Sequence, residues 1–297
     1  MHFLIFGLGY TGTAIAAGAA ARGWRVTATS RDPSRLTPPP GVTLIRFADA
    51  GRALVDATHV LQTAAPGTAE GPIPDRGQDP ALALFADEIA AAPLAWLGYL
   101  STTGVYGNRD GGWVDEATPP APSSPRGQRR LDAENAWRRA AAGKPLDLFR
   151  VAGIYGPGRS PFDEIRGGRA RRVSKPGHLF GRIHRDDIAA AVLAAAARPD
   201  GTRVLNLNDD EPATSADVTA EAARLLGLPT PPLIPFDEAR RTMSEMGLSF
   251  WAENRRVRSV QTQATLGLRW RYPTYREGLA ATLAASRAEE LGQARPQ

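Results

Sequence analysis

Three glycines near the start of the chain constrain its fold more than any other feature. They form the motif Gly7-Leu-Gly9-Tyr-Thr-Gly12, which follows an apolar run at residues 2–6 and precedes a helix-forming stretch at 11–22. A strand, a glycine-rich turn and a helix in this order are typical of a Rossmann βαβ unit, whose helix amino terminus faces a pyrophosphate. The motif therefore predicts a dinucleotide site, with Gly7, Gly9, Tyr10, Thr11 and Gly12 as its first contacts.

The rest of the chain continues the alternation of strands and helices as far as about residue 158. Further strands are predicted at residues 24–30, 42–47, 58–63, 94–101 and 146–151, with helices at 79–92 and 127–142. This spacing favours a doubly wound parallel sheet of the α/β class. Beyond it, the same criteria predict helices at 185–197, 215–226 and 275–291 and a strand at 203–207.

Because the regular alternation of strands and helices ends near residue 158, we expect the chain to form two parts. We expect a Rossmann-type NADP-binding domain at residues 1–157, to which residues 183–207 return. Residues 158–182 and 208–297 are expected to form a smaller α/β substrate-binding lobe. The segment 229–235, rich in proline, is expected to be a rigid connection.

Composition excludes several kinds of chemistry. The absence of cysteine rules out disulfides and cysteine-ligated metals, and the four histidines are scattered, so no metal site is expected. The net charge of +5 comes from dispersed arginines without an aromatic stacking platform, so no nucleic-acid partner is predicted. No leader or membrane-length apolar run is evident, so we expect a cytoplasmic protein without a membrane partner.

The end of the second predicted strand favours NADP(H) over NAD(H). Sites for NAD usually place a carboxylate there to bind the ribose 2′-hydroxyl, whereas this strand ends in Thr29-Ser30-Arg31. A hydroxyl followed by a planar guanidinium suits a 2′-phosphate, although an exposed turn arginine is the alternative. Asp49, after the third strand, either accepts a hydrogen bond from the adenine amino group or is a solvated loop acid.

Several further motifs resemble the extended short-chain dehydrogenase/reductases, which include NAD-dependent epimerases and dehydratases. Besides the glycine motif, they are LSTTGVYG at 100–107, RVAGIYGPG at 150–158, HRDD at 184–187 and LGLRWRYPTYREG at 266–278. The resemblance spans essentially the whole chain. Further cofactor contacts are then expected at the ends of later strands, at Ala64, Ala65, Pro66, Ser101, Ala152, Gly153 and Ile154.

The resemblance also implies a catalytic position and reveals a departure from the family. Thr102 falls on the family's catalytic Ser/Thr, unless it only satisfies backbone groups at the strand end. The family carries Tyr-x-x-x-Lys on the next helix, but here Arg126 and Arg130 stand at the two positions, and no tyrosine has a lysine four residues later. Arginine cannot donate a proton near neutrality. The chain thus resembles an atypical member that lacks the dyad.

Different roles remain open for these residues. Arg130 is expected to bind the cofactor ribose and Arg126 an anionic substrate or a developing oxyanion, unless both lie on a solvated helix face. The alternative proton donors are Tyr106, which also suits a packing role, Tyr155 and His184. We predict an NADP(H)-dependent oxidoreductase or epimerase acting on a carbonyl or hydroxyl group of a small molecule. The alternative is a non-catalytic NADP(H)-binding redox sensor. A homodimer would use helices 79–92 and 127–142.

Overall fold

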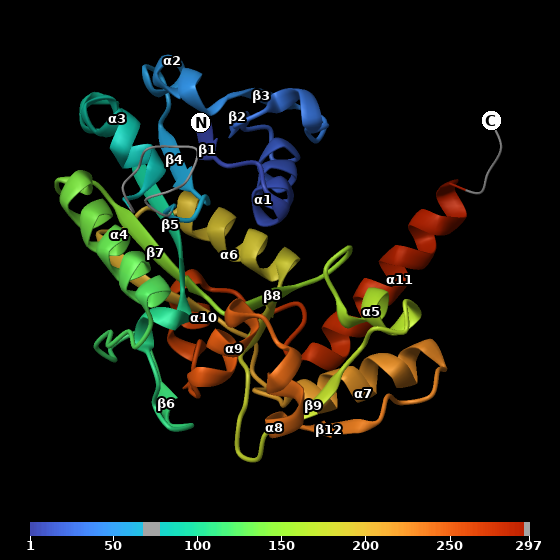
Figure 1. The fold of residues 1–297 in the computed structure, drawn as a ribbon. Helices are drawn as coiled ribbons and strands as arrows, with labels where there is room; N and C mark the ends of the chain where they lie inside the picture. Colours follow the sequence, from blue (N-terminus) through green and yellow to red (C-terminus); the bar gives the residue numbers. More distant parts are fainter. Residues whose placement is uncertain (68–77, 294–297) are drawn as a thin grey trace.

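A seven-stranded parallel sheet forms the centre of the computed structural model, which describes residues 1–67 and 78–293 (Figure 1). Its strands lie in the order β11-β7-β5-β4-β1-β2-β3. They are β1 (His2–Phe6), β2 (Arg25–Ser30), β3 (Val42–Arg46), β4 (His59–Gln62), β5 (Trp96–Thr102), β7 (Leu146–Val151) and β11 (Thr202–Leu207). The doubly wound α/β class is confirmed. The strand order reverses between β1 and β4, which opens a crevice at their carboxyl ends.

Helices cover both faces of the sheet, which explains why β1 is apolar and buried at all five positions. On one face lie α1 (Tyr10–Ala20) and α6 (Arg185–Ala197), whose small residues let them pack closely around Phe3 and Ile5. The other face carries α2 (Ala50–Leu54), α3 (Pro80–Ala91) and α4 (Pro125–Ala141). There Phe85 and Trp137 pack with the side chains of β1 that point the opposite way.

The remaining elements gather beyond one end of the sheet (Figure 1). The helices α5 (Pro161–Arg166), α7 (Ser215–Leu226) and α11 (Tyr275–Gln293) share one apolar cluster. A second cluster surrounds Trp251 on α9 (Glu245–Ala252), next to α8 (Phe236–Ala239). Three short parallel pairs connect distant segments, namely β8 (Gly153–Tyr155) with β10 (Arg182–His184), β9 (Arg172–Ser174) with β12 (Leu233–Pro235), and β6 (Trp113–Val114) with β13 (Arg256–Val257). The helix α10 (Val260–Leu266) follows β13.

The strands and helices predicted from the sequence end within about two residues of their observed ends. The prediction missed α2, α5, α8, α9, α10 and the short pairs. Residues 233–235, expected within a rigid connection, form β12, which pairs with residues 172–174. These elements have few residues and partners far along the chain, so local periodicity carries little information about them. Among residues 1–67 and 78–293, no helix has both the length and the apolarity that spanning a membrane requires.

Candidate active site

The turn after β1 is tightly packed at Gly12 and open at Gly9. Gly7 has a φ of +100°, which favours glycine, and its N–H donates to Thr29 Oγ1 at 3.0 Å. A Cβ on Gly12 would overlap the carbonyl oxygen of Gly7, so only glycine lets α1 start this close to the turn. At Gly9 a Cβ would meet nothing within 4 Å. Tight packing at Gly12 and open space at Gly9 fit a pyrophosphate that approaches the backbone.

The amino end of α1 has no cap from the chain itself. Gly9 at the N-cap supplies no side-chain hydrogen bond, and no acidic residue lies in the first turn. The first N–H groups, those of Tyr10 and Thr11, are therefore suited to bind an anion. The Tyr10 ring faces the guanidinium groups of Arg185 at 4.9 Å and Arg159 at 5.8 Å. Two positive charges thus border the place where the glycine motif would hold phosphates.

The ends of β2 and β3 form a second candidate anion site. Their register pairs Ser30 with Arg46, and both Arg46 and Arg31 are exposed. Asp32 follows Arg31 in the chain, but its carboxylate accepts hydrogen bonds from Ser34 N at 3.2 Å and Ser34 Oγ at 2.6 Å. The role of Arg46 could not be predicted from the sequence, because a strand-end arginine belongs to no motif. Only the parallel pairing of β3 with β2 places it beside Ser30.

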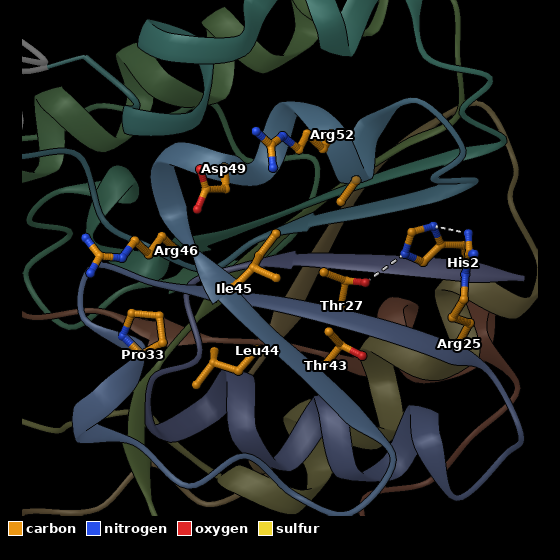
Figure 2. Close-up of a pocket in the computed structure, with 11 residues that line it drawn as sticks. His2, Arg25, Thr27, Pro33, Thr43, Leu44, Ile45, Arg46, Asp49 and Arg52 are labelled. Carbon is orange, nitrogen blue, oxygen red and sulfur yellow. Dashed lines mark hydrogen bonds between the residues drawn. The ribbon is translucent and has the colours of Figure 1, made fainter.

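A surface hollow of about 640 Å³ opens along β3. Figure 2 shows Arg46 and Asp49 at one end of it and His2 near the other. His2 Nδ1 bonds to Asp56 Oδ1 at 2.8 Å, and Nε2 bonds to Thr27 Oγ1 at 2.9 Å, so these groups satisfy one another. Asp49 is exposed at the carboxyl end of β3. The end of the hollow with Asp49 and Arg46 is the one that borders the ends of β2 and β3.

The other residues predicted to contact the cofactor follow β4, β5 and β7 at the same edge of the sheet. They are Ala64, Ala65 and Pro66 after β4 and Ala152, Gly153 and Ile154 after β7. A Cβ on Gly7 would lie 3.3 Å from Ala64 N, so the two turns are in contact. Ser101 differs from expectation, because its buried hydroxyl donates to Glu134 Oε1 at 2.6 Å on the side of α4. Its side chain therefore points away from the crevice.

Thr102 ends β5 and lies at the mouth of the crevice. Its Oγ1 accepts a hydrogen bond from Gly104 N at 3.1 Å, as the backbone-satisfying alternative requires. That bond uses a lone pair only, and the hydroxyl proton has no acceptor in the part of the chain that the structure describes. Thr102 can therefore serve the backbone and still donate a hydrogen bond to a ligand oxygen.

Tyr106 is fully buried four residues later. Its hydroxyl lies 2.8 Å from both Asp115 O and Asn206 Oδ1, and the Arg150 guanidinium faces its ring at 4.7 Å. Burial raises the pKa of this phenol above its usual range. The geometry contradicts a role as proton donor and agrees with the packing role that the sequence left open.

Arg126 and Arg130 lie one turn apart on α4, but their surroundings differ. Arg130 donates to the carbonyl of Leu100 on β5, and its guanidinium faces the ring of Tyr99 at 5.1 Å. Arg126 is exposed, and its guanidinium lies 5.3 Å from the centre of the Phe250 ring on α9. Arg130 thus anchors α4 to the end of β5, whereas Arg126 lies further out, where α4 faces α9.

Tyr155 and His184, the remaining predicted proton donors, are buried beside each other with ring centres 5.3 Å apart. His184 Nδ1 accepts from Asp186 N at 3.2 Å and caps α6, while Nε2 lies 3.3 Å from Thr282 Oγ1. Burial lowers the pKa of His184 to about 4 and raises that of Tyr155. Both residues therefore belong to the packed interior and neither is poised to exchange a proton near neutrality.

Comparison with known proteins agrees with this architecture. No family model matches the chain. Protein YeeZ of Escherichia coli K12 is 30% identical over 238 residues, which cover 76% of this chain and 84% of YeeZ. A 3-diazoavenalumate denitrifying reductase from Streptomyces is 29% identical over 145 residues, 44% of this chain and 45% of that protein.

Solved structures extend the likeness to nearly the whole chain. A conserved protein of unknown function from Silicibacter pomeroyi superposes with a TM-score of 0.84 and 43% identity, covering 96% of this chain and 99% of that one. MoeE5 in complex with UDP-glucuronic acid and NAD has the same fold, with a TM-score of 0.80 and 24% identity over 97% of this chain and all of its own. The chain belongs to the family of protein YeeZ and shares the fold of MoeE5.

Proposed function

We propose that the protein binds NADP(H) and transfers a hydride between it and a carbonyl or secondary alcohol of a small molecule. The observation that carries the proposal is the turn from β1 to α1, with an uncapped helix terminus beside an open glycine at the switch point of the sheet. Free N–H groups at a helix amino terminus and a glycine without a neighbouring side chain are the features that bind a pyrophosphate in such a turn. The likeness to a reductase and to an NAD-bound structure supports the same chemistry.

A preference for the phosphorylated cofactor rests on the ends of β2 and β3. Ser30, Arg31 and Arg46 offer one hydroxyl and two guanidinium groups, and the carboxylate that follows Arg31, that of Asp32, caps its own turn. Guanidinium groups bind phosphate oxygens bidentately, whereas a ribose 2′-hydroxyl is usually bound by a free carboxylate. This arrangement supports NADP(H) over NAD(H).

The chain's own contribution to the reaction centres on Thr102. When bound, the dihydronicotinamide supplies a hydride to the substrate carbon. The free hydroxyl proton of Thr102 would donate a hydrogen bond to the substrate oxygen and stabilise the charge that develops there. Since neither arginine on α4 gives up a proton near neutrality, the substrate oxygen takes its proton from water.

A specific observation also favours the second candidate, a binding protein that senses the redox state of the cofactor. Tyr106, Tyr155 and His184 are all buried in packing contacts, so none of the three predicted proton donors reaches the crevice. A sensor would need only the turn after β1 and the phosphate-binding ends of β2 and β3. Turnover separates the two candidates, because a sensor binds the cofactor without oxidising it.

Titration calorimetry with NADPH and NADH tests the cofactor site. Wild-type protein should bind NADPH at least about tenfold more tightly than NADH, since charge-assisted contacts to a phosphate are strong. Arg31→Asp should remove or reverse the preference and Arg46→Gln should reduce it. Arg35→Gln, an exposed arginine in the following turn, is the matched control and should change nothing. Absence of binding by both nucleotides would refute the proposal.

NADPH oxidation against a panel of carbonyl compounds tests the reaction. Thr102→Ala should lower kcat at least about tenfold without weakening NADPH binding, because one donor to the developing charge is lost. Thr102→Ser keeps the hydroxyl and should retain most of the activity. Equal activity in the alanine and serine variants would show that the hydroxyl takes no part. NADPH binding without turnover of any carbonyl would favour the sensor.

A further inference from the structure

The place where α4 faces α9 leaves apolar side chains uncovered next to an arginine. Met246 and Phe250 on α9 are 68% and 52% exposed, and they lie one helical turn apart on the same side of the helix. Phe250 contacts the guanidinium of Arg126 on α4. An aromatic ring, a thioether and a guanidinium therefore lie at the surface where α9 meets α4.

Positive charge accumulates at the same place. The pKa of Arg126 is lowered, first because part of its side chain is desolvated and then by the charges of Arg130, Arg129 and Arg159. Arg159 also faces the Tyr10 ring at the amino end of α1, so one of the charges that act on Arg126 borders the turn after β1. This placement brings together cations from two segments of the chain, the start of α4 and the loop before α5.

Two of these charges have no carboxylate partner in the part of the chain that the structure describes. In residues 1–67 and 78–293, neither Arg126 nor Arg159 forms an ion pair with a carboxylate. Glu253, just after α9, is already engaged by Arg255 at 2.7 Å and by Ser123 Oγ at 2.7 Å. Like charges that repel one another without a counter-ion are costly, and a bound anion would relieve the repulsion.

We infer that the substrate is an organic anion with an apolar group, whose carboxylate or phosphate binds between Arg126 and Arg159 while the apolar group packs on Phe250 and Met246. The inference deepens the proposed function and rests on it. Since Gly127, next to Arg126, lies against the carbonyl oxygen of Gly104, whose N–H donates to Thr102 Oγ1, the anionic group lies close to the oxygen that Thr102 binds. A 2-oxo acid with an aromatic side chain has this arrangement of a carboxylate next to a carbonyl.

Calorimetry with three probes tests this inference on the full chain. The probes are phenylpyruvate, its uncharged methyl ester and phenyl phosphate, each titrated with and without saturating NADP⁺. We expect phenylpyruvate to bind at least about tenfold more tightly than the ester, because a bidentate guanidinium contact is lost in the ester. Tighter binding of phenyl phosphate than of phenylpyruvate would identify a phosphate as the anionic group. Equal binding of acid and ester, or binding of neither anion, would overturn the inference.

Single-residue variants distinguish a specific anion site between Arg126 and Arg159 from a general attraction of anions to positive charge. Arg126→Gln and Arg159→Gln should each weaken the preferred anion at least about tenfold, and Phe250→Ala should weaken it less. Arg129→Gln removes the same charge next to Arg126 and should have little effect. A loss in Arg129→Gln equal to that in Arg126→Gln would refute a specific site. NADPH titrations of the same proteins report on the cofactor site separately, so failure of the anion site and failure of the proposed function are distinguishable.

Discussion

Replacing Glu134 by glutamine should destabilise the protein strongly, although the two side chains have nearly the same shape. Glu134 is fully buried on α4, and Arg150 on β7 is 2% exposed. The carboxylate accepts hydrogen bonds from Arg150 Nε at 3.1 Å, from Arg150 Nη2 at 2.9 Å and from Ser101 Oγ at 2.6 Å. The substitution leaves the Arg150 guanidinium buried without the counter-ion that binds it through two hydrogen bonds.

The expected loss of stability depends on which hydrogen bonds the glutamine can still make. Removing one partner of a buried ion pair costs about 3–5 kcal/mol, because the other charge remains desolvated. Glutamine keeps one oxygen for Ser101 and Arg150 Nε, so we expect about 3 kcal/mol, at the low end of the range. The double variant Glu134→Gln/Arg150→Met no longer buries a charge and should recover at least about half of that loss.

Urea denaturation followed by the fluorescence of the buried Trp96 and Trp137 measures these differences. The midpoint should fall in Glu134→Gln with an unchanged slope, as expected for a loss of stability alone. Glu88→Gln, the same substitution at an exposed position of α3, is the control and should shift the free energy of unfolding by less than about 0.5 kcal/mol. A loss below about 1 kcal/mol in Glu134→Gln, or a double variant no more stable than the single one, would refute this account of the pair.

Three further predictions rest on other contacts. Gly12→Ala should lower both the melting temperature and the affinity for NADPH in calorimetry, because its Cβ would overlap a backbone carbonyl, whereas Gly9→Ala, whose Cβ meets nothing, should lower only the affinity. Gly278→Ala would overlap the Tyr155 hydroxyl and should cost about 1–3 kcal/mol in urea denaturation, with partial rescue by Tyr155→Phe. The pKa of His184 is about 4 when folded and about 6.5 when unfolded, so the unfolded chain binds more protons between these values. Stability should therefore fall by about 3 kcal/mol for this group as the pH drops from about 6.5 to about 4, and His184→Asn should flatten that part of the stability–pH curve.

The fold could be predicted from the sequence because its information is local. The run His2–Phe6, the glycines after it and the helix that follows are contiguous, and buried parallel strands are recognisable as short apolar runs. The pair of β9 with β12 could not be predicted in this way. Each strand has three residues, and their partners lie about sixty residues apart, so neither has a periodicity of its own.

The candidate site, like the fold, could be predicted from the sequence only in part. Motif positions such as Gly7 and Thr102 could be identified, but the direction of a side chain at the end of a strand needs the packing around it. Ser101 and Thr102 are neighbours on β5, so their side chains point to opposite faces, and only Thr102 reaches the crevice. Arg46 and Phe250 carry no motif and come to the site through contacts with β2 and α4. Such contacts are properties of the folded chain.

The two halves of the candidate site are built from different groups, backbone in one and side chains in the other. One half can therefore change in evolution without the other. The half at the turn after β1 consists mostly of backbone N–H groups and of glycines that keep side chains away, so substitutions on α4 do not disturb it. The half at the end of β5 depends on side chains, among them Thr102 and the two arginines of α4, Arg126 and Arg130. Cofactor binding and proton transfer are thus physically separable in this fold. In the function proposed above, the arginines at the start of α4 bind the charge of the substrate, and the turn after β1 binds the cofactor independently of them.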